Sequence, residues 1–185
     1  MKGFTLVELV IVLIITAILS AVFAPIIIDA LKNSQLNACT EQVASHLRHA
    51  RSVAMAKGQV VGVIFLNPAA SNSEYYVKSY DAADTMCSNG TFVQDPLDPS
   101  KNLDVRFDDP LRSEFSGVSL ASANFPDLLG GTQTVYFNAT GVPYPTCPLG
   151  SYMLTPGKVV LQSPNGTTVT IYVSDHSGAV VVKGP

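Results

Sequence analysis

The chain has 185 residues, a formal net charge of −3 and only 14% charged residues, and it contains no Trp. This length suits one ordinary domain with a hydrophobic core. The slightly acidic balance argues against a broadly basic surface, and therefore against a general affinity for nucleic acids.

The first predicted element is an apolar helix over residues 4–28, in which Glu8 is the one charged residue. As a helix this stretch would be about 37 Å long. A bilayer core is roughly 30 Å thick, so the stretch can span a membrane. An ordinary secretory signal fits less well, because its apolar region is usually about 7–15 residues long. Pro25, directly after the nearest small-x-small site, also disfavours cleavage there.

Glu8 requires an explanation, because a charge at mid-membrane costs about 2.5–3.5 kcal/mol. One interpretation is an interfacial carboxylate without a role. The other is a carboxylate that awaits a positively charged partner. A cut between Gly3 and Phe4 would create an α-amino group four residues before Glu8. Between neighbouring, axially staggered helices, such an amine and the carboxylate could meet and neutralise each other.

The stretch "GFTLVELVIVLIITAILSAV" closely resembles the amino-terminal motif of type IV pilins and type II secretion pseudopilins. The resemblance covers about the first thirty residues. It implies that a prepilin peptidase cuts after Gly3 and that Phe4 is then N-methylated. It further implies that Glu8 acts in assembly and that Pro25 kinks the helix. Residues 1–3 would be the leader peptide, and residues 4–28 the transmembrane and assembly helix.

The helix is predicted to continue through residues 29–58 with one apolar face. Apolar residues recur there at steps of seven, four, three and four, which is typical of an amphipathic helix; they are Leu36, Val43, Leu47, Ala50 and Ala54. Gly58 is the expected stop, just after Lys57 in the last turn. The helix therefore spans roughly residues 4–57 and must pack its apolar face on the strands that follow.

Residues 59–185 are predicted to form a globular, β-rich domain. Runs rich in β-branched and aromatic residues predict strands at 59–66, 73–80, 103–107, 116–122 and 132–138. Residues 81–110 are turn-rich, and residues 141–150, with three prolines, are predicted to be a loop. The last strands, 157–163, 167–173 and 179–184, form two consecutive hairpins with glycine-containing turns. The fold class is therefore α+β, a long helix packed on an antiparallel β domain.

A second stretch, "LRHARSVAMAKGQVVGVIF", looks like the helix-to-first-strand segment of the GspH/FimT family of minor pilins and pseudopilins. That family ends in a hairpin-rich β domain with a glycine turn, as in "VSDHSGAVVV". The residues that carry the resemblance are Ala50, Arg51, Ser52, Ala54, Lys57, Gly58 and Gly178.

The three cysteines are Cys39, Cys87 and Cys147. None forms a C-x-x-C pair, so a structural zinc site is not expected. Cys87 and Cys147 lie in turn-rich stretches of a domain that the anchor places outside the cytoplasm, where disulfides persist. We predict that these two pair. Cys39 lies on the helix, either as a small buried residue or in a disulfide within or between chains.

Chemistry-bearing motifs are few. Asp175, His176 and Ser177 are adjacent, and adjacent side chains cannot converge as a catalytic triad does. His46 and His49 are three apart on the helix, with no third ligand at metal-binding spacing. The sequence also lacks a phosphate-binding glycine loop. We therefore expect no enzymatic activity, no cofactor and no metal site.

The densest basic cluster of the outer domain comprises Arg48, His49, Arg51 and Lys57. A solvated helix face, or packing against acidic neighbours in a filament, explains it most simply. A DNA-contact patch is the alternative, because some members of the resembled family bind DNA through basic surfaces that include the carboxyl-terminal region. Here that end offers only Lys183, which weakens the DNA hypothesis.

The sequence therefore predicts a minor pilin or pseudopilin, a structural subunit of a type IV pilus or a type II secretion pseudopilus. The alternatives are a DNA-binding minor pilin of an uptake pilus, and a major pilin. The expected partners are other pilin subunits, the prepilin peptidase and the bacterial inner membrane, with the globular domain outside the cytoplasm. The sequence does not distinguish the two systems or name partner subunits.

Overall fold

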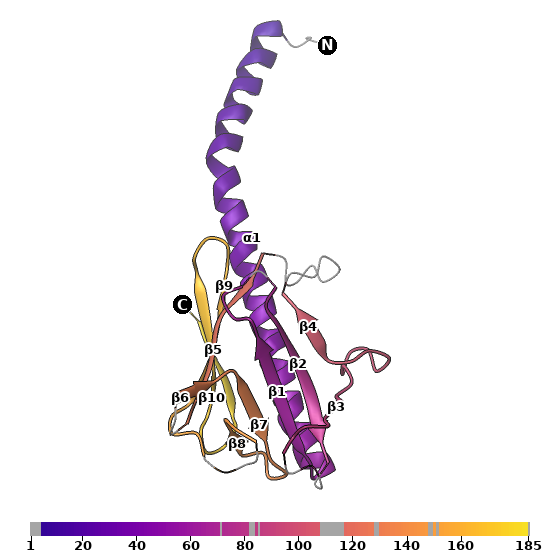
Figure 1. Cartoon of the computed structure of the whole chain (residues 1–185). Coiled ribbons are helices and arrows are strands. Elements are labelled where there is room, and N and C mark those ends of the chain that lie inside the picture. The colour runs from indigo at the N-terminus through magenta and orange to yellow at the C-terminus, as the bar shows by residue number, and fades with distance from the viewer. Residues whose placement is uncertain are drawn as a thin grey trace.

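The computed structural model describes residues 5–70, 72–81, 84, 86–107, 117–127, 130–147, 150 and 152–184. Its main feature is a long helix whose carboxyl-terminal half lies against two sheets, while its amino-terminal half projects away from them (Figure 1). The predicted α+β architecture is confirmed.

Helix α1 covers Leu6–Lys57. Its projecting part exposes large apolar side chains all round, from Leu6 to Leu31. Further along, all five residues of the predicted inner face are buried: Leu36, Val43, Leu47, Ala50 and Ala54. The helix ends where the sequence predicts, because Gly58 adopts the left-handed conformation with φ 63° and donates its N–H to the carbonyl oxygen of Ala54.

Among the described residues, a six-stranded antiparallel sheet is ordered β3-β2-β1-β7-β8, and β4 also pairs with β2. Its central strand is β1, in which Val63 lies between Val77 of β2 and Val135 of β7. The members of this sheet are β1 (Val60–Leu66), β2 (Glu74–Tyr80), β3 (Thr91–Phe92), β4 (Asp104–Arg106), β7 (Thr134–Phe137) and β8 (Pro143–Tyr144).

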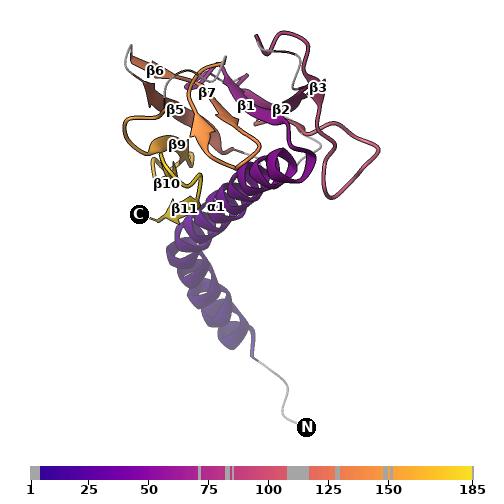
Figure 2. The same ribbon diagram turned by 90° about the horizontal axis from the view of Figure 1, so that it is seen from below.

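The second sheet has five strands within the described parts of the chain, in the order β11-β10-β9-β5-β6. The two predicted terminal hairpins are confirmed, with β10 pairing to β9 on one side and β11 on the other. Figure 2 shows β11 beside α1 at one edge of this sheet. Its strands are β5 (Ser119–Asp127), β6 (Gly130–Thr132), β9 (Gly157–Gln162), β10 (Thr168–Val173) and β11 (Val180–Lys183).

Three short strands were not predicted, namely β3, β6 and β8. Each has two or three residues, too few to show an alternating apolar pattern. The prediction of a loop over residues 141–150 was wrong at β8, which pairs with β7. Strand β5 also continues past residue 122 to Asp127, because its second half pairs with β6.

The core lies between α1 and the inner faces of both sheets. Phe65 of β1 joins them, since its ring is 5.4 Å from that of Tyr75 in β2 and 6.0 Å from that of Phe125 in β5. The hydroxyl of Tyr75 is hydrogen-bonded to Nδ1 of the buried His46, at 2.7 Å. Cys39 is fully buried on the same helix face, as expected for a small core residue.

The predicted disulfide between Cys87 and Cys147 is confirmed, with Cα atoms 6.0 Å apart. It joins the segment between β2 and β3 to the segment after β8. These segments belong to opposite edges of the six-stranded sheet. Gly90, three residues after Cys87, packs on the ring of Tyr80 on the outer face of this sheet. Tyr80 is consequently only 4% exposed, and burial raises its pKa to about 12.

Removing this disulfide should destabilise the outer domain. The bridge spans 60 residues, and closing a loop of that length contributes about 4 kcal/mol in the chain-entropy model. We expect a Cys87→Ser/Cys147→Ser double variant to unfold at a lower guanidinium chloride concentration than the wild type. The near-UV circular dichroism of the tyrosines measures this unfolding. Reductant should bring the wild type to the level of the variant and leave the variant unchanged. An unshifted wild-type midpoint under reduction would contradict the assignment.

Candidate functional site

The projecting end of α1 begins with a capping box formed by Thr5 and Glu8. The Thr5 hydroxyl oxygen accepts the backbone N–H of Glu8 at 3.3 Å. The Glu8 carboxylate in turn accepts the backbone N–H of Thr5 at 3.3 Å and the Thr5 hydroxyl at 3.2 Å. Such a box satisfies helix N–H groups that have no partner within the helix. Gly3 and Phe4, the predicted cleavage and methylation positions, lie outside the described residues.

Sequence reasoning missed this box, although its signal is local. A threonine followed three residues later by a glutamate, just before an apolar run, is the usual pattern of a helix start. Glu8 therefore has a role within its own chain that neither of the two interpretations from the sequence included. Both groups that its Oε2 atom contacts, the backbone N–H and the hydroxyl of Thr5, belong to the residue that caps the helix, so the carboxylate stays at the exposed end of the helix.

The apolar side chains from Leu6 to Leu31 are about 40–80% exposed. A continuous surface of this kind is not stable in water, because it leaves apolar area hydrated along the whole projecting segment. By length and composition, α1 can cross a membrane. The projecting half therefore requires cover from lipid, from other helices, or from each in turn.

Pro25 lies inside α1, and the helix continues through it. Proline has no N–H, so the carbonyl of Ala21 loses its usual helical partner. Figure 1 shows the projecting half of α1 curving away from the sheets. A kink at Pro25 itself stays a prediction.

The arginines of the basic cluster hold α1 against the sheets. Arg51 donates its Nε–H to the carbonyl oxygen of Gly141, at 3.1 Å, in the turn after β7. Arg48 donates to the carbonyl oxygen of Val180 in β11, at 3.3 Å, and lies 3.6 Å from the carboxylate of Glu41. Contacts within the chain thus explain both side chains.

Arg51, Gly141 and Gly178 form a tight cluster that we call the Arg51 clamp. Gly141 and Gly178 both have positive φ, 78° and 64°. A Cβ atom on Gly141 would lie 2.9 Å from Arg51 Nε, and one on Gly178 would meet the carbonyl oxygen of Gly141. Only glycine fits either position. Gly141 lies in the turn between β7 and β8 and Gly178 in the turn between β10 and β11. The clamp therefore joins α1 to one turn from each of the two sheets.

The two helical histidines face different surroundings. His46 points into the core toward Tyr75, whereas His49 lines a groove at the surface. They therefore do not share a ligand, and the described residues contain no group of three or more metal-ligating side chains. Asp175, His176 and Ser177 lie in the turn between β10 and β11, as predicted, with His176 exposed.

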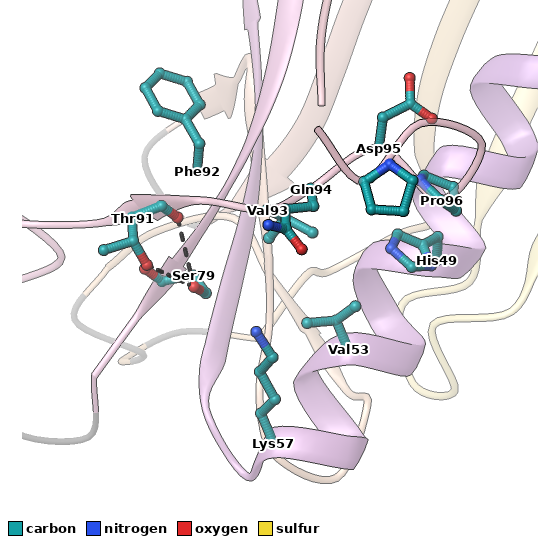
Figure 3. A pocket seen from close by; sticks show the side chains of 11 residues that line it. His49, Val53, Lys57, Ser79, Thr91, Phe92, Val93, Gln94, Asp95 and Pro96 are labelled. Carbon is teal, nitrogen blue, oxygen red and sulfur yellow. Dashed lines mark hydrogen bonds between the residues drawn. The ribbon is translucent and has the colours of Figure 1, made fainter. Parts of the chain in front are cut away.

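The groove with His49 lies between the last turns of α1 and the segment that follows β3 (Figure 3). Its volume is about 490 Å³, and it is lined by His49, Val53, Lys57, Ser79, Thr91, Phe92, Val93, Gln94, Asp95, Pro96 and Pro99. Burial lowers the pKa of His49, Asp95 acts in the opposite direction, and Lys57 lowers it further. The sequence did not predict this groove.

Comparison with known proteins agrees with the amino-terminal features. A family model for the prokaryotic N-terminal methylation motif matches residues 1–24. The chain also has the fold of a solved structure, the minor pseudopilin EpsH from the type 2 secretion system of Vibrio cholerae. The TM-score is 0.52, with 12% identity, and the match covers 82% of this chain and 98% of EpsH.

The chain therefore has a prokaryotic N-terminal methylation motif at residues 1–24 and the fold of a minor pseudopilin. At 12% identity the likeness to EpsH concerns the fold alone. None of the curated protein sequences matches the chain.

The clamp gives Arg51 a structural role in this chain. We expect Arg51→Ala to lower the free energy of unfolding by about 1–3 kcal/mol, because the Gly141 carbonyl loses its donor. Arg48→Ala is the control, since an exposed charged contact contributes at most about 1 kcal/mol. Guanidinium unfolding of both variants measures the difference. Equal midpoints would contradict the assignment of Arg51 as the tighter contact.

Proposed function

We propose that the chain is a minor pilin or pseudopilin, a structural and not a catalytic subunit of a fibre anchored first in the bacterial inner membrane. The observation that carries this proposal is the projecting half of α1. It exposes apolar side chains all round, holds Glu8 as its one ionisable residue from position 5 to 28, and is attached to a folded β domain.

This geometry supports a subunit that changes its surroundings. In a bilayer, lipid covers the exposed apolar helix, and the β domain lies on the outer side of the membrane. In a fibre, the projecting helices of neighbouring subunits cover one another. The helix length suits either environment, and the wide apolar surface permits contacts on several sides.

Glu8 supplies the specific contact in this proposal. A prepilin peptidase cuts between Gly3 and Phe4, and the new amine is methylated. The carboxylate then leaves its capping box, at least in part, and pairs with the α-amine of Phe4 in a neighbouring subunit. Burying one of these charges without the other costs about 3–5 kcal/mol, which favours the correct axial stagger over others.

The support for assigning the chain to either a type IV pilus or a type II secretion pseudopilus is weaker than the support for a pilin-like subunit. The neighbour in fold, EpsH, is a minor pseudopilin of a secretion system. The pattern around Arg51 resembles minor subunits of both systems. A DNA-receptor role is the weaker alternative, because Arg48 and Arg51 already contact carbonyl oxygens of their own chain.

Processing is tested by mass spectrometry of the assembled protein. We expect the loss of residues 1–3 and the addition of one methyl group on Phe4. Gly3→Val should leave the precursor uncut in the membrane, because a peptidase that admits the backbone closely does not tolerate a branched side chain there. Intact Met1 in fibres would contradict the proposal.

The role of the Glu8 charge can be separated from its role in the cap. Glutamine replaces glutamate in a capping box but carries no charge, so Glu8→Gln keeps the helix start. We expect Glu8→Gln and Glu8→Leu to insert in the membrane and fold, yet to enter sheared fibres poorly. Glu8→Asp should be intermediate, because its carboxylate reaches less far.

Cell fractionation measures the result as the ratio of subunit in the membrane to subunit in sheared fibres. If Glu8→Gln assembles like the wild type while Glu8→Leu does not, the cap and not the charge is the assembly requirement. If both assemble normally, the carboxylate makes no assembly contact.

A further inference from the structure

The tripeptide Asn-Gly-Thr occurs twice in the chain, at residues 89–91 and 165–167, and no other asparagine precedes a glycine. An asparagine before a glycine loses its side-chain amide most readily, because glycine has no Cβ atom to hinder ring closure through its backbone nitrogen. Since the two copies have the same three residues, a difference in their reactivity has to come from their surroundings in the fold.

The second copy lies in the turn between β9 and β10, and hydrogen bonds hold its reacting groups. The Gly166 N–H donates to the carbonyl oxygen of Ser163 at 2.9 Å. The Asn165 side chain donates from its nitrogen to Asn33 on α1 at 3.1 Å, and its oxygen accepts the N–H of Thr167 at 3.1 Å. Ring closure must break the first of these bonds and disturb the other two, so this copy is protected.

The first copy lacks this protection. Asn89 is exposed, and its backbone N–H donates to the carboxylate of Asp84 at 2.7 Å. Among the residues that the structure describes, neither the Asn89 side chain nor the Gly90 N–H has a hydrogen-bond partner. The backbone nitrogen of Gly90 and the side-chain amide of Asn89 are therefore both available for reaction.

We propose that Asn89 is a site of spontaneous deamidation. The backbone nitrogen of Gly90 loses its proton and bonds to the side-chain carbonyl carbon of Asn89, whose amide group takes up a proton and leaves as ammonia. Water then adds to one of the two carbonyl carbons of the succinimide ring and breaks its bond to the Gly90 nitrogen, which regains a proton. The product is aspartate or isoaspartate, with one water consumed and one ammonia released, and no enzyme, oxidant or reductant is required.

Both products alter the segment next to the disulfide at Cys87. The new carboxylate adds a negative charge beside Asp84, whose own carboxylate accepts the Asn89 N–H, and like charges repel. In isoaspartate the main chain is also one methylene longer. Gly90 packs on the ring of Tyr80 with no room for a Cβ atom, so the longer chain displaces this contact. Deamidation should therefore loosen the packing on Tyr80.

The test compares both asparagines within one molecule. The full chain in detergent micelles is kept in mildly alkaline buffer enriched in ¹⁸O water, and its peptides are then analysed by mass spectrometry. We expect Asn89 to be converted at least about tenfold faster than Asn165, because hydrogen bonds hold the reacting groups only at Asn165. Products formed during the incubation carry ¹⁸O in the new carboxylate, which separates them from products formed during digestion.

Two controls separate the effect of the fold from that of the sequence. In guanidinium chloride with reductant the chain is unfolded, and the two sites should then react at similar rates. Asn33→Ala removes the α1 partner of the Asn165 side chain, so it should accelerate the conversion of Asn165 and leave that of Asn89 unchanged.

Similar rates at the two sites in the folded chain, or a faster reaction at Asn165, would overturn the proposal. An Asn89 that stays intact in the folded chain while both sites react in the unfolded chain would overturn it as well, since the fold would then protect this site. The proposal is independent of fibre assembly, because the reaction needs only the folded chain and water.

Discussion

The structure depends on one continuous helix that must be stable in two different surroundings. From Leu6 to Leu31 the side chains of α1 are exposed and apolar, and from Leu36 onward one face is buried under the sheets. The change occurs around Asp29 and Lys32, which form an ion pair at 3.8 Å. Just beyond it, Asn33 accepts a hydrogen bond from Asn165 in the turn after β9, at 3.1 Å. The β domain therefore begins to contact the helix where the all-round apolar surface ends.

The β domain is fixed to this helix by contacts that are distant in the sequence. The inner face of α1 packs on strands of both sheets, and apolar packing gives most of the stability. Packing alone is not directional, however. The bonds from Arg48 to Val180 and from Arg51 to Gly141 add direction, because each joins a guanidinium to one backbone carbonyl. They set how the domain is turned about the helix axis.

The periodic parts of the fold could be predicted, because burial leaves a pattern in the sequence. Leu36, Val43 and Leu47 recur at helical spacing, and the strand around Val63 is a continuous apolar run. The two-residue strands β3 and β8 could not be predicted, because their pairing depends on which loops meet in space. The contact of Arg51 with Gly141 could not be predicted either, because the two residues are 90 positions apart in the sequence. The sequence shows the charge of Arg51 but not the carbonyl that it binds.

The continuity of α1 also connects the two candidate sites. In an α-helix each residue advances the direction of the side chain by about 100°. The number of residues between Glu8 and the Arg51 clamp, together with any bend at Pro25, therefore determines which side of the β domain Glu8 faces. If Glu8 fixes the axial position of a subunit among its neighbours, the clamp fixes which surface of the β domain those neighbours meet. Lys57, which lies about two and a half turns after Arg48 on the same helix, then faces one defined direction and not many.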